Sequence, residues 1–212
     1  AIKANADGTA NNYATNPTQA QYAAIGVTGV DSTTKESLLG DVVDSKPFSA
    51  VDTVPEVQAL ADAAAAVMTG AVAGTAPTKA QLEALGITGV TDANLSAIQA
   101  AIAATPDDGT GVDTLSELQA VANVGATNAA NAAAAAAALS TISAAAQADN
   151  ASNTNVPASV FATAGVTGVD ANNVAAIQSA LNSAAVNGTA TDTLPEVQAI
   201  VDAYNAIKAN AD

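Results

Sequence analysis

Ala23-Ala-Ile-Gly-Val-Thr-Gly-Val-Asp31 determines how this sequence is interpreted, because the stretch recurs. Two further copies are Glu83-Ala-Leu-Gly-Ile-Thr-Gly-Val-Thr91 and Ala162-Thr-Ala-Gly-Val-Thr-Gly-Val-Asp170. A stretch that returns at intervals of this size is typical of a repeat protein, in which one small unit is the object to explain. We therefore expect three similar modules in place of one domain of 212 residues.

A second recurring stretch follows each copy and reads Asp-Thr-Val/Leu-Pro/Ser-Glu-Val/Leu-Gln-Ala, starting at Asp52, Asp113 and Asp192. The interval from the first glycine of a copy to the threonine of this second stretch is the same in all copies to within one residue. By contrast, the interval from that threonine to the proline that opens the next copy is almost twice as long after copy two as after copy one. Each module therefore has a compact part of nearly constant length and a variable continuation.

The recurring stretches contain helix start and stop signals. Thr18 with Gln21, and Thr78 with Gln81, form the capping-box pattern that begins a helix. The third copy has Pro157-Ala-Ser-Val at this place and lacks the box. The first glycine of each copy is expected to adopt the left-handed backbone conformation that ends this first helix.

A second helix is expected after the glycines of each copy, beginning near Asp31, Thr91 and Asp170. Its apolar residues follow the i, i+3, i+7 spacing of one helical face. In copy one Lys35 interrupts this pattern at its first position.

A third helix begins at a Thr-x-x-Glu capping box, at Thr53, Thr114 and Thr193. In copy two it is predicted from Leu115 to about Gln147, with Gly125 as a candidate kink.

The fold class expected from these patterns is all-α. We expect a tandem array of small three-helix-bundle modules with long alanine-rich connecting helices, forming an extended rod or fibre. The expected division is 1–14 (end of a preceding third helix and linker), 15–75 (module 1), 76–152 (module 2, with a long third helix) and 153–212 (module 3, truncated). Ala1–Asp7 and Ala206–Asp212 are identical, which predicts that the pattern continues beyond both ends.

Composition limits the function. Alanine is the commonest residue and aromatic residues make up only 2% of the chain, so the expected core is thin and the helices approach closely. The net charge is −15, which excludes the basic footprint of a nucleic-acid-binding protein and disfavours anionic membranes. No segment has the roughly 20 unbroken apolar residues of a membrane span. The sequence contains no cysteine, so disulfide bonds cannot stabilise the fold.

Catalysis is not expected, because His, Cys and Arg are absent. The recurring acidic pairs Asp52/Glu56, Asp113/Glu117 and Asp192/Glu196 stand where helix N-termini favour negative charge. The loop from Pro106 to Asp113 has carboxylates spaced around glycines, so a calcium site in this loop stays an open alternative. The loop lacks the regular alternation of ligand residues in an EF-hand loop. We assign no catalytic, cofactor-binding or metal-ligating residue from the sequence.

The pattern Pro-Thr-x-Ala-Gln-x-x-Ala-Leu/Ile-Gly-Ile/Val-Thr-Gly-Val, followed by Asp-Thr-Leu-Ser/Pro-Glu-Leu/Val-Gln-Ala, resembles helical repeats of very large bacterial surface proteins. These include biofilm-associated and RTX-type adhesins exported by type I secretion. The resemblance covers most of the chain and is weaker at the first helix of copy three. It carries no binding-site residues.

What the resemblance implies is an extracellular stalk, spacer or matrix fibre on a bacterial cell, used in adhesion or biofilm. The expected partners are neighbouring modules of the same chain. One alternative is a self-assembling filament or surface-layer subunit, in which modules associate laterally through alanine faces. Another is a helical module that binds a host protein or glycan.

Overall fold

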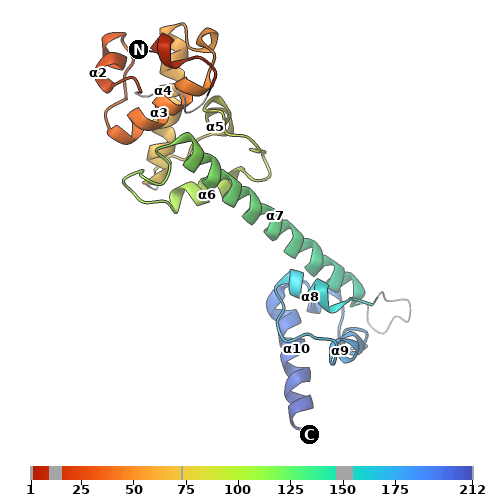
Figure 1. Ribbon diagram of the computed structural model, residues 1–212. Coiled ribbons are helices and arrows are strands. Elements are labelled where there is room, and N and C mark those ends of the chain that lie inside the picture. Colours follow the sequence, from red (N-terminus) through yellow and green to blue (C-terminus); the bar gives the residue numbers. More distant parts are fainter. Residues whose placement is uncertain (1, 10–15, 73, 147–154, 212) are drawn as a thin grey trace. The chain divides into compact units, whose positions relative to one another are not determined.

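A computed structural model describes residues 2–9, 16–72, 74–146 and 155–211 (Figure 1). It is mostly helical and contains no strand in these ranges, so the all-α prediction is confirmed. The α-helices are α1 (Ile2–Asn5), α2 (Gln19–Ala24), α3 (Thr33–Ser45), α4 (Val54–Ala71), α5 (Lys79–Ala84), α6 (Leu95–Ala103), α7 (Leu115–Ala145), α8 (Ala158–Ala164), α9 (Val174–Leu181) and α10 (Leu194–Ala209). Two short 3-10 helices are η1 (Phe48–Ala50) and η2 (Gly188–Ala190).

The three copies give the same order of elements. The first helices are α2, α5 and α8, the second helices are α3, α6 and α9, and the third helices are α4, α7 and α10. The expected capping boxes are present at the first helices of copies one and two and at α4 and α10. As the missing threonine predicts, α8 begins after Pro157 without a side-chain cap.

Two of the second helices begin later than predicted. α6 starts at Leu95, four residues after Thr91, because Thr91 and Asn94 form a reciprocal turn first. The Thr91 N–H donates to Asn94 Oδ1 at 2.8 Å, and the Asn94 N–H donates to Thr91 Oγ1 at 3.3 Å. Asp170 and Asn173 form the same turn ahead of α9. In copy one Lys35, which interrupts the apolar pattern, forms an ion pair with Asp31 at 2.7 Å.

The long third helix of copy two is confirmed, since α7 runs from Leu115 to Ala145. Residue 147, its expected end, lies outside the described residues. Gly125 does not end the helix. A Cβ atom at Gly125 would lie 2.5 Å from the Cα of Ile98 and 2.7 Å from its nitrogen, so glycine allows the backbones of α6 and α7 to approach closely.

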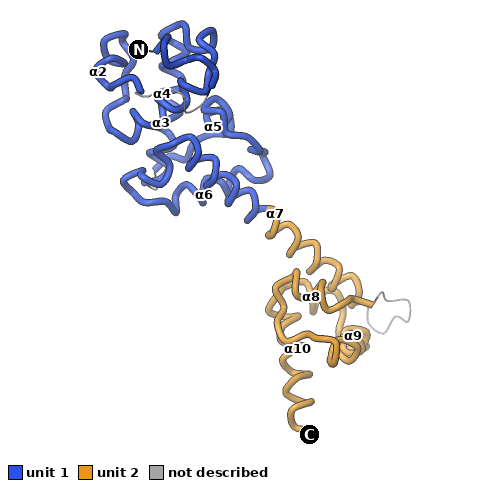
Figure 2. The backbone as a smooth tube through the Cα atoms, in the orientation of Figure 1, with its two compact units in different colours: residues 1–129 blue, residues 130–212 orange. Residues whose placement is uncertain are grey.

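Two compact units divide the chain, residues 1–129 and residues 130–212 (Figure 2). Each has its own apolar core. The core of the first unit combines copies one and two and includes Leu38, Val42, Leu82, Ile98 and Ile102. The core of the second unit includes Ile142, Phe161, Ile177, Leu181 and Val197. The division falls within α7, and the module boundaries expected from the repeat stay a prediction.

Third helices contribute to the copy that follows them as well as to their own. α4 contacts α3 of its own copy and also α5 and α6 of copy two. The end of α7 supplies Ala138 and Ile142, and the next residue supplies Ala146, to the core that contains Phe161 and Ile177. α1, whose sequence is identical to that of residues 207–210 at the end of α10 and its cap, contacts α3. A third helix therefore closes the core of the next copy.

Candidate functional site

The feature that recurs with constant geometry is the turn between the first and second helices. In copy two the N–H of Gly86 donates to the carbonyl of Glu83 at 2.9 Å, and the N–H of Ile87 donates to that of Leu82 at 3.0 Å. This is the Schellman arrangement, and the φ of Gly86 is +95°, as the sequence predicts. Gly89 also has a positive φ, +77°, which an L side chain rarely adopts. The turn therefore needs both glycines.

A glutamine of the third helix holds this turn in every copy. The side-chain amide of Gln58 accepts the N–H of Thr28 at 2.8 Å and donates to its carbonyl at 3.1 Å. Gln119 does the same to Thr88, at 2.9 and 3.3 Å. The third pair is Gln198 with Thr167, at 2.8 and 3.1 Å. We call each threonine–glutamine pair a joint.

An acceptor on the next helical turn orients each glutamine. Gln58 Nε2 donates to Asp62 at 2.8 Å, Gln198 Nε2 donates to Asp202 at 2.8 Å, and the equivalent bond from Gln119 goes to Asn123 at 2.9 Å. The joint therefore satisfies both backbone groups of a loop residue that is distant in sequence and fixes the third helix against the turn. Because the joints are exposed, they position these elements more than they stabilise them.

Replacing Gln58 with alanine should leave the Thr28 backbone groups to water. We expect a loss of about 1 kcal/mol in the free energy of unfolding and faster hydrogen exchange at the Thr28 amide. Gln58→Glu keeps the acceptor and loses the donor, so it should retain part of the amide protection. Urea denaturation and hydrogen exchange by NMR measure both effects. Unchanged exchange at Thr28 in Gln58→Ala would show that the joint does not form.

The glutamates of two recurring acidic pairs, Glu56 and Glu196, act as helix caps. Glu56 Oε2 accepts from the N–H of Thr53 at 3.0 Å and from its hydroxyl at 2.8 Å. These bonds, the hydroxyl first, hold the pKa of Glu56 below its usual range. In copy three a side-chain hydrogen bond with Glu196 raises the pKa of Asp192. The helix N-termini therefore explain the two glutamates.

The lowered pKa of Glu56 makes capping sensitive to acid. A carboxyl group whose folded-state pKa is depressed stabilises the fold above its unfolded pKa, and this stabilisation is lost as pH falls through the folded value. In Glu56→Gln the cap is kept, as Gln81 shows, but the group no longer titrates. We expect the urea midpoint to fall less between pH 5 and pH 3 in this variant than in the parent chain. Glu83→Gln, an exposed change of equal charge, is the control, and equal pH profiles for both variants would contradict the assignment.

The loop considered for calcium forms a hydrogen-bonded turn. Asp108 Oδ1 accepts from the hydroxyl of Thr110 at 2.7 Å and from its N–H at 3.1 Å, which lowers the pKa of Asp108. Within the described ranges, no group of three or more His, Cys, Asp or Glu residues could hold a metal ion. No residue is therefore assigned to a metal.

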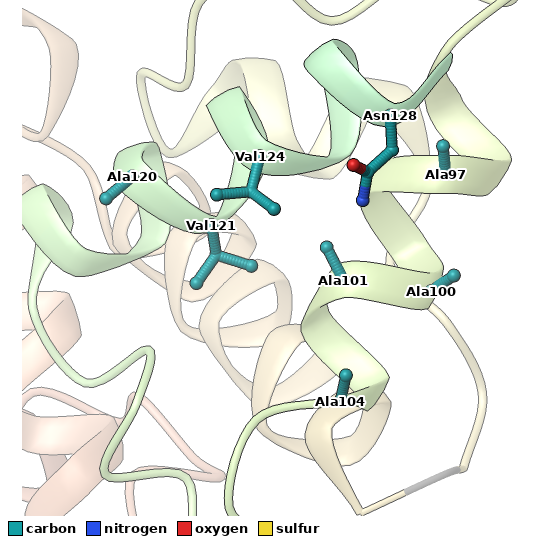
Figure 3. A pocket seen from close by; sticks show the side chains of 8 residues that line it. All are labelled: Ala97, Ala100, Ala101, Ala104, Ala120, Val121, Val124 and Asn128. Atoms are coloured by element: carbon teal, nitrogen blue, oxygen red, sulfur yellow. The ribbon is translucent and has the colours of Figure 1, made fainter. Parts of the chain in front are cut away.

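An apolar groove of about 460 Å³ lies between α6 and α7 (Figure 3). Alanine methyl groups and the side chains of Val121 and Val124 line it, and Val124 is 56% exposed. Asn128 is the only polar residue of the lining. A small-molecule site normally has several convergent polar groups that orient the ligand, so this groove lacks the features of one.

No protein-family model, curated protein or solved structure matches this chain. The three copies within the chain are therefore the basis for comparison. Among the described residues no helix has both the length and the apolar character needed to cross a membrane. The glutamine and threonine of the joint belong to the repeated sequence pattern, which by itself assigns them no role. Their recurrence at a nearly constant interval was the available signal.

Proposed function

We propose that this chain is a structural repeat segment of an extracellular bacterial surface or matrix protein. It acts as a stalk, spacer or fibre in adhesion or biofilm. The observation that carries the proposal is the triplicated joint: the same Thr–Gln hydrogen bonds recur in copies that share no reactive group.

Variation in third-helix length supports the spacer role. α4 has 18 residues and α7 has 31. Each residue added to an α-helix contributes about 1.5 Å of rise and about 100° of rotation. With a fixed joint at its beginning, the length of a third helix sets both the distance and the direction at which the following core is built. Modules of this kind extend an array in one dimension.

Composition supports a location outside the cell. A net charge of −15 keeps a long chain soluble and self-repelling. The absence of Cys and the scarcity of Lys and Arg leave few sites for oxidation or trypsin-like cleavage. The absence of His, Cys and Arg also favours a protein that is not an enzyme.

Immunogold electron microscopy of the cells that produce the protein tests this proposal. With antibodies raised against the chain, we expect label outside the cell envelope, on surface fibres or matrix. Brief protease treatment of intact cells should remove that label while a cytoplasmic marker protein survives. Label confined to the cytoplasm would contradict the proposal.

A further inference from the structure

Asn187 and Gly188 form the one Asn-Gly pair of the sequence. They lie in the loop between α9 and α10 (Figure 1), where Asn187 caps η2 and Gly188 is its first residue. Asparagine is a labile residue, because its side-chain amide reacts with the backbone nitrogen of the residue that follows it. A glycine in that next position leaves the nitrogen unhindered, since glycine has no Cβ.

The turn holds the side chain of Asn187 over the start of η2. Asn187 Oδ1 accepts from the hydroxyl of Thr189 at 2.6 Å, from the N–H of Thr189 at 3.1 Å and from the N–H of Ala190 at 3.2 Å. Cγ is one bond away from this oxygen, so the amide carbon stays beside the intervening nitrogen of Gly188. Two groups held together in one chain react at a far higher effective concentration than two free molecules.

The two nitrogens of this reaction are free of competing hydrogen bonds. The first N–H of a helix has no acceptor within that helix, and among the described residues none accepts the N–H of Gly188. Asn187 Nδ2 likewise donates to no described residue, and Asn187 is exposed to water. By contrast, the amide nitrogen of Asn173 donates to two acceptors, and a valine follows that residue.

Copy two shows that an aspartate fits this turn. Asp108 and Asn187 lie at the same distance before the third helix of their copies. Asp108 Oδ1 accepts from the hydroxyl and the N–H of Thr110, as Asn187 Oδ1 accepts from those of Thr189. An aspartate at position 187 therefore keeps the acceptor that the turn uses.

We propose that Asn187–Gly188 is a self-modifying site, at which the folded chain converts the asparagine into aspartate and isoaspartate without an enzyme. The Gly188 nitrogen loses its proton to solvent and attacks Cγ of Asn187. The N–Cγ bond forms, the Cγ–Nδ2 bond breaks, and the amide nitrogen takes up a proton and leaves as ammonia. Water then opens the five-membered succinimide ring, so the net reaction consumes one water molecule and releases one ammonia. This site does not depend on the proposed function.

The two products differ in their effect on the loop. Opening of the ring at Cγ restores the normal main chain and gives aspartate, which adds one negative charge. Opening at the main-chain carbonyl gives isoaspartate, which lengthens the main chain by one atom directly before η2. The carbonyl of Gly188 follows at once and accepts from Ser143 Oγ at 2.7 Å. The isoaspartyl product should therefore disturb the contact between η2 and the end of α7.

Peptide mapping by mass spectrometry, on the intact chain incubated at mildly alkaline pH, tests the proposal. Asn187 should convert at least about tenfold faster than the other asparagines of the chain. Isoaspartate, identified by electron-transfer fragmentation, should be among the products, because direct hydrolysis of the amide by water gives aspartate alone. Conversion no faster than at the other asparagines, or aspartate without isoaspartate, would overturn the proposal.

Variants distinguish attack by Gly188 from a general lability of the loop. Gly188→Ala places a methyl group beside the attacking nitrogen and should slow conversion at least about tenfold, while alanine fits the negative φ of a 3-10 helix. Ala185→Gly, a change of the same size at an exposed position outside the ring, should leave the rate within about twofold of the parent. Equal rates in Gly188→Ala and the parent chain would contradict the assignment. Asn187→Asp should keep the urea midpoint of the parent, and a lower midpoint would show that the turn does not accommodate the aspartate.

Discussion

Phe161→Ala should lower the free energy of unfolding of the second unit by about 3–5 kcal/mol. Phe161 is fully buried and is the only aromatic side chain among the buried residues described in that core. Several of the other core residues are alanines, which leave little apolar area to compensate. A unit of this size is stabilised by roughly 0.05–0.15 kcal/mol per residue in total, so the loss is a large share of its stability.

Differential scanning calorimetry distinguishes this effect from a general destabilisation. Because each unit has its own core, the variant should show the transition of residues 130–212 at a clearly lower temperature, with that of residues 1–129 nearly unchanged. Val160→Ala, a half-buried change next to it, is the control and should shift the same transition much less. A single transition in the Phe161→Ala variant that moves as a whole would contradict the assignment of separate cores.

Gly125→Ala should destabilise the first unit by about 1–3 kcal/mol, although alanine is the better helix former by about 1 kcal/mol. The added Cβ would lie 2.5 Å from the Cα of Ile98 and 2.9 Å from the carbonyl oxygen of Ala97. Both are backbone atoms, so α6 and α7 must separate to make room. Urea denaturation measures the change.

The control for this substitution is Asn128→Ala on the same helix. Asn128 is exposed, and its replacement by alanine should be neutral or stabilising by a few tenths of a kcal/mol. If Gly125→Ala instead raised the stability of the chain, the close approach of α6 and α7 would be wrong.

Local signals made the helix boundaries predictable. A capping box such as Thr78 with Gln81 connects residues three positions apart, and a Schellman glycine such as Gly86 acts within one helical turn. These interactions involve only residues close together in the chain, so they can be predicted directly from the sequence. The start of α6 was predicted four residues early because the Thr91–Asn94 turn competes locally with the helix.

Contacts between residues far apart in the sequence could not be predicted from the periodicity of apolar residues. The bond between Thr28 and Gln58 joins residues 30 positions apart, and a pattern of apolar residues carries no information on where an exposed amide points. Gly125 was interpreted as a candidate kink because propensity describes a helix in isolation. A glycine is required at position 125 because the backbone of α6 lies against it, and only the packed structure shows this contact.

The core of unit 1 also combines two sequence copies. α4 packs against α5 and α6 of the next copy, so the packing unit is offset from the sequence unit. Val67 and Ala71, at the end of α4, belong to the core of copy two as much as to that of copy one. The apolar stripe of a helix shows that it is buried but not by which partner.

Small-angle X-ray scattering of the intact chain in solution tests the central proposal, that fixed joints and third helices of variable length build an extended array. A single globule of 212 residues would have a radius of gyration of about 17 Å. Two units of 129 and 83 residues with their centres one full length of α7 apart, about 46 Å, would give roughly 26 Å. The array account predicts a value near the larger figure, and a value near that of the single globule would contradict it.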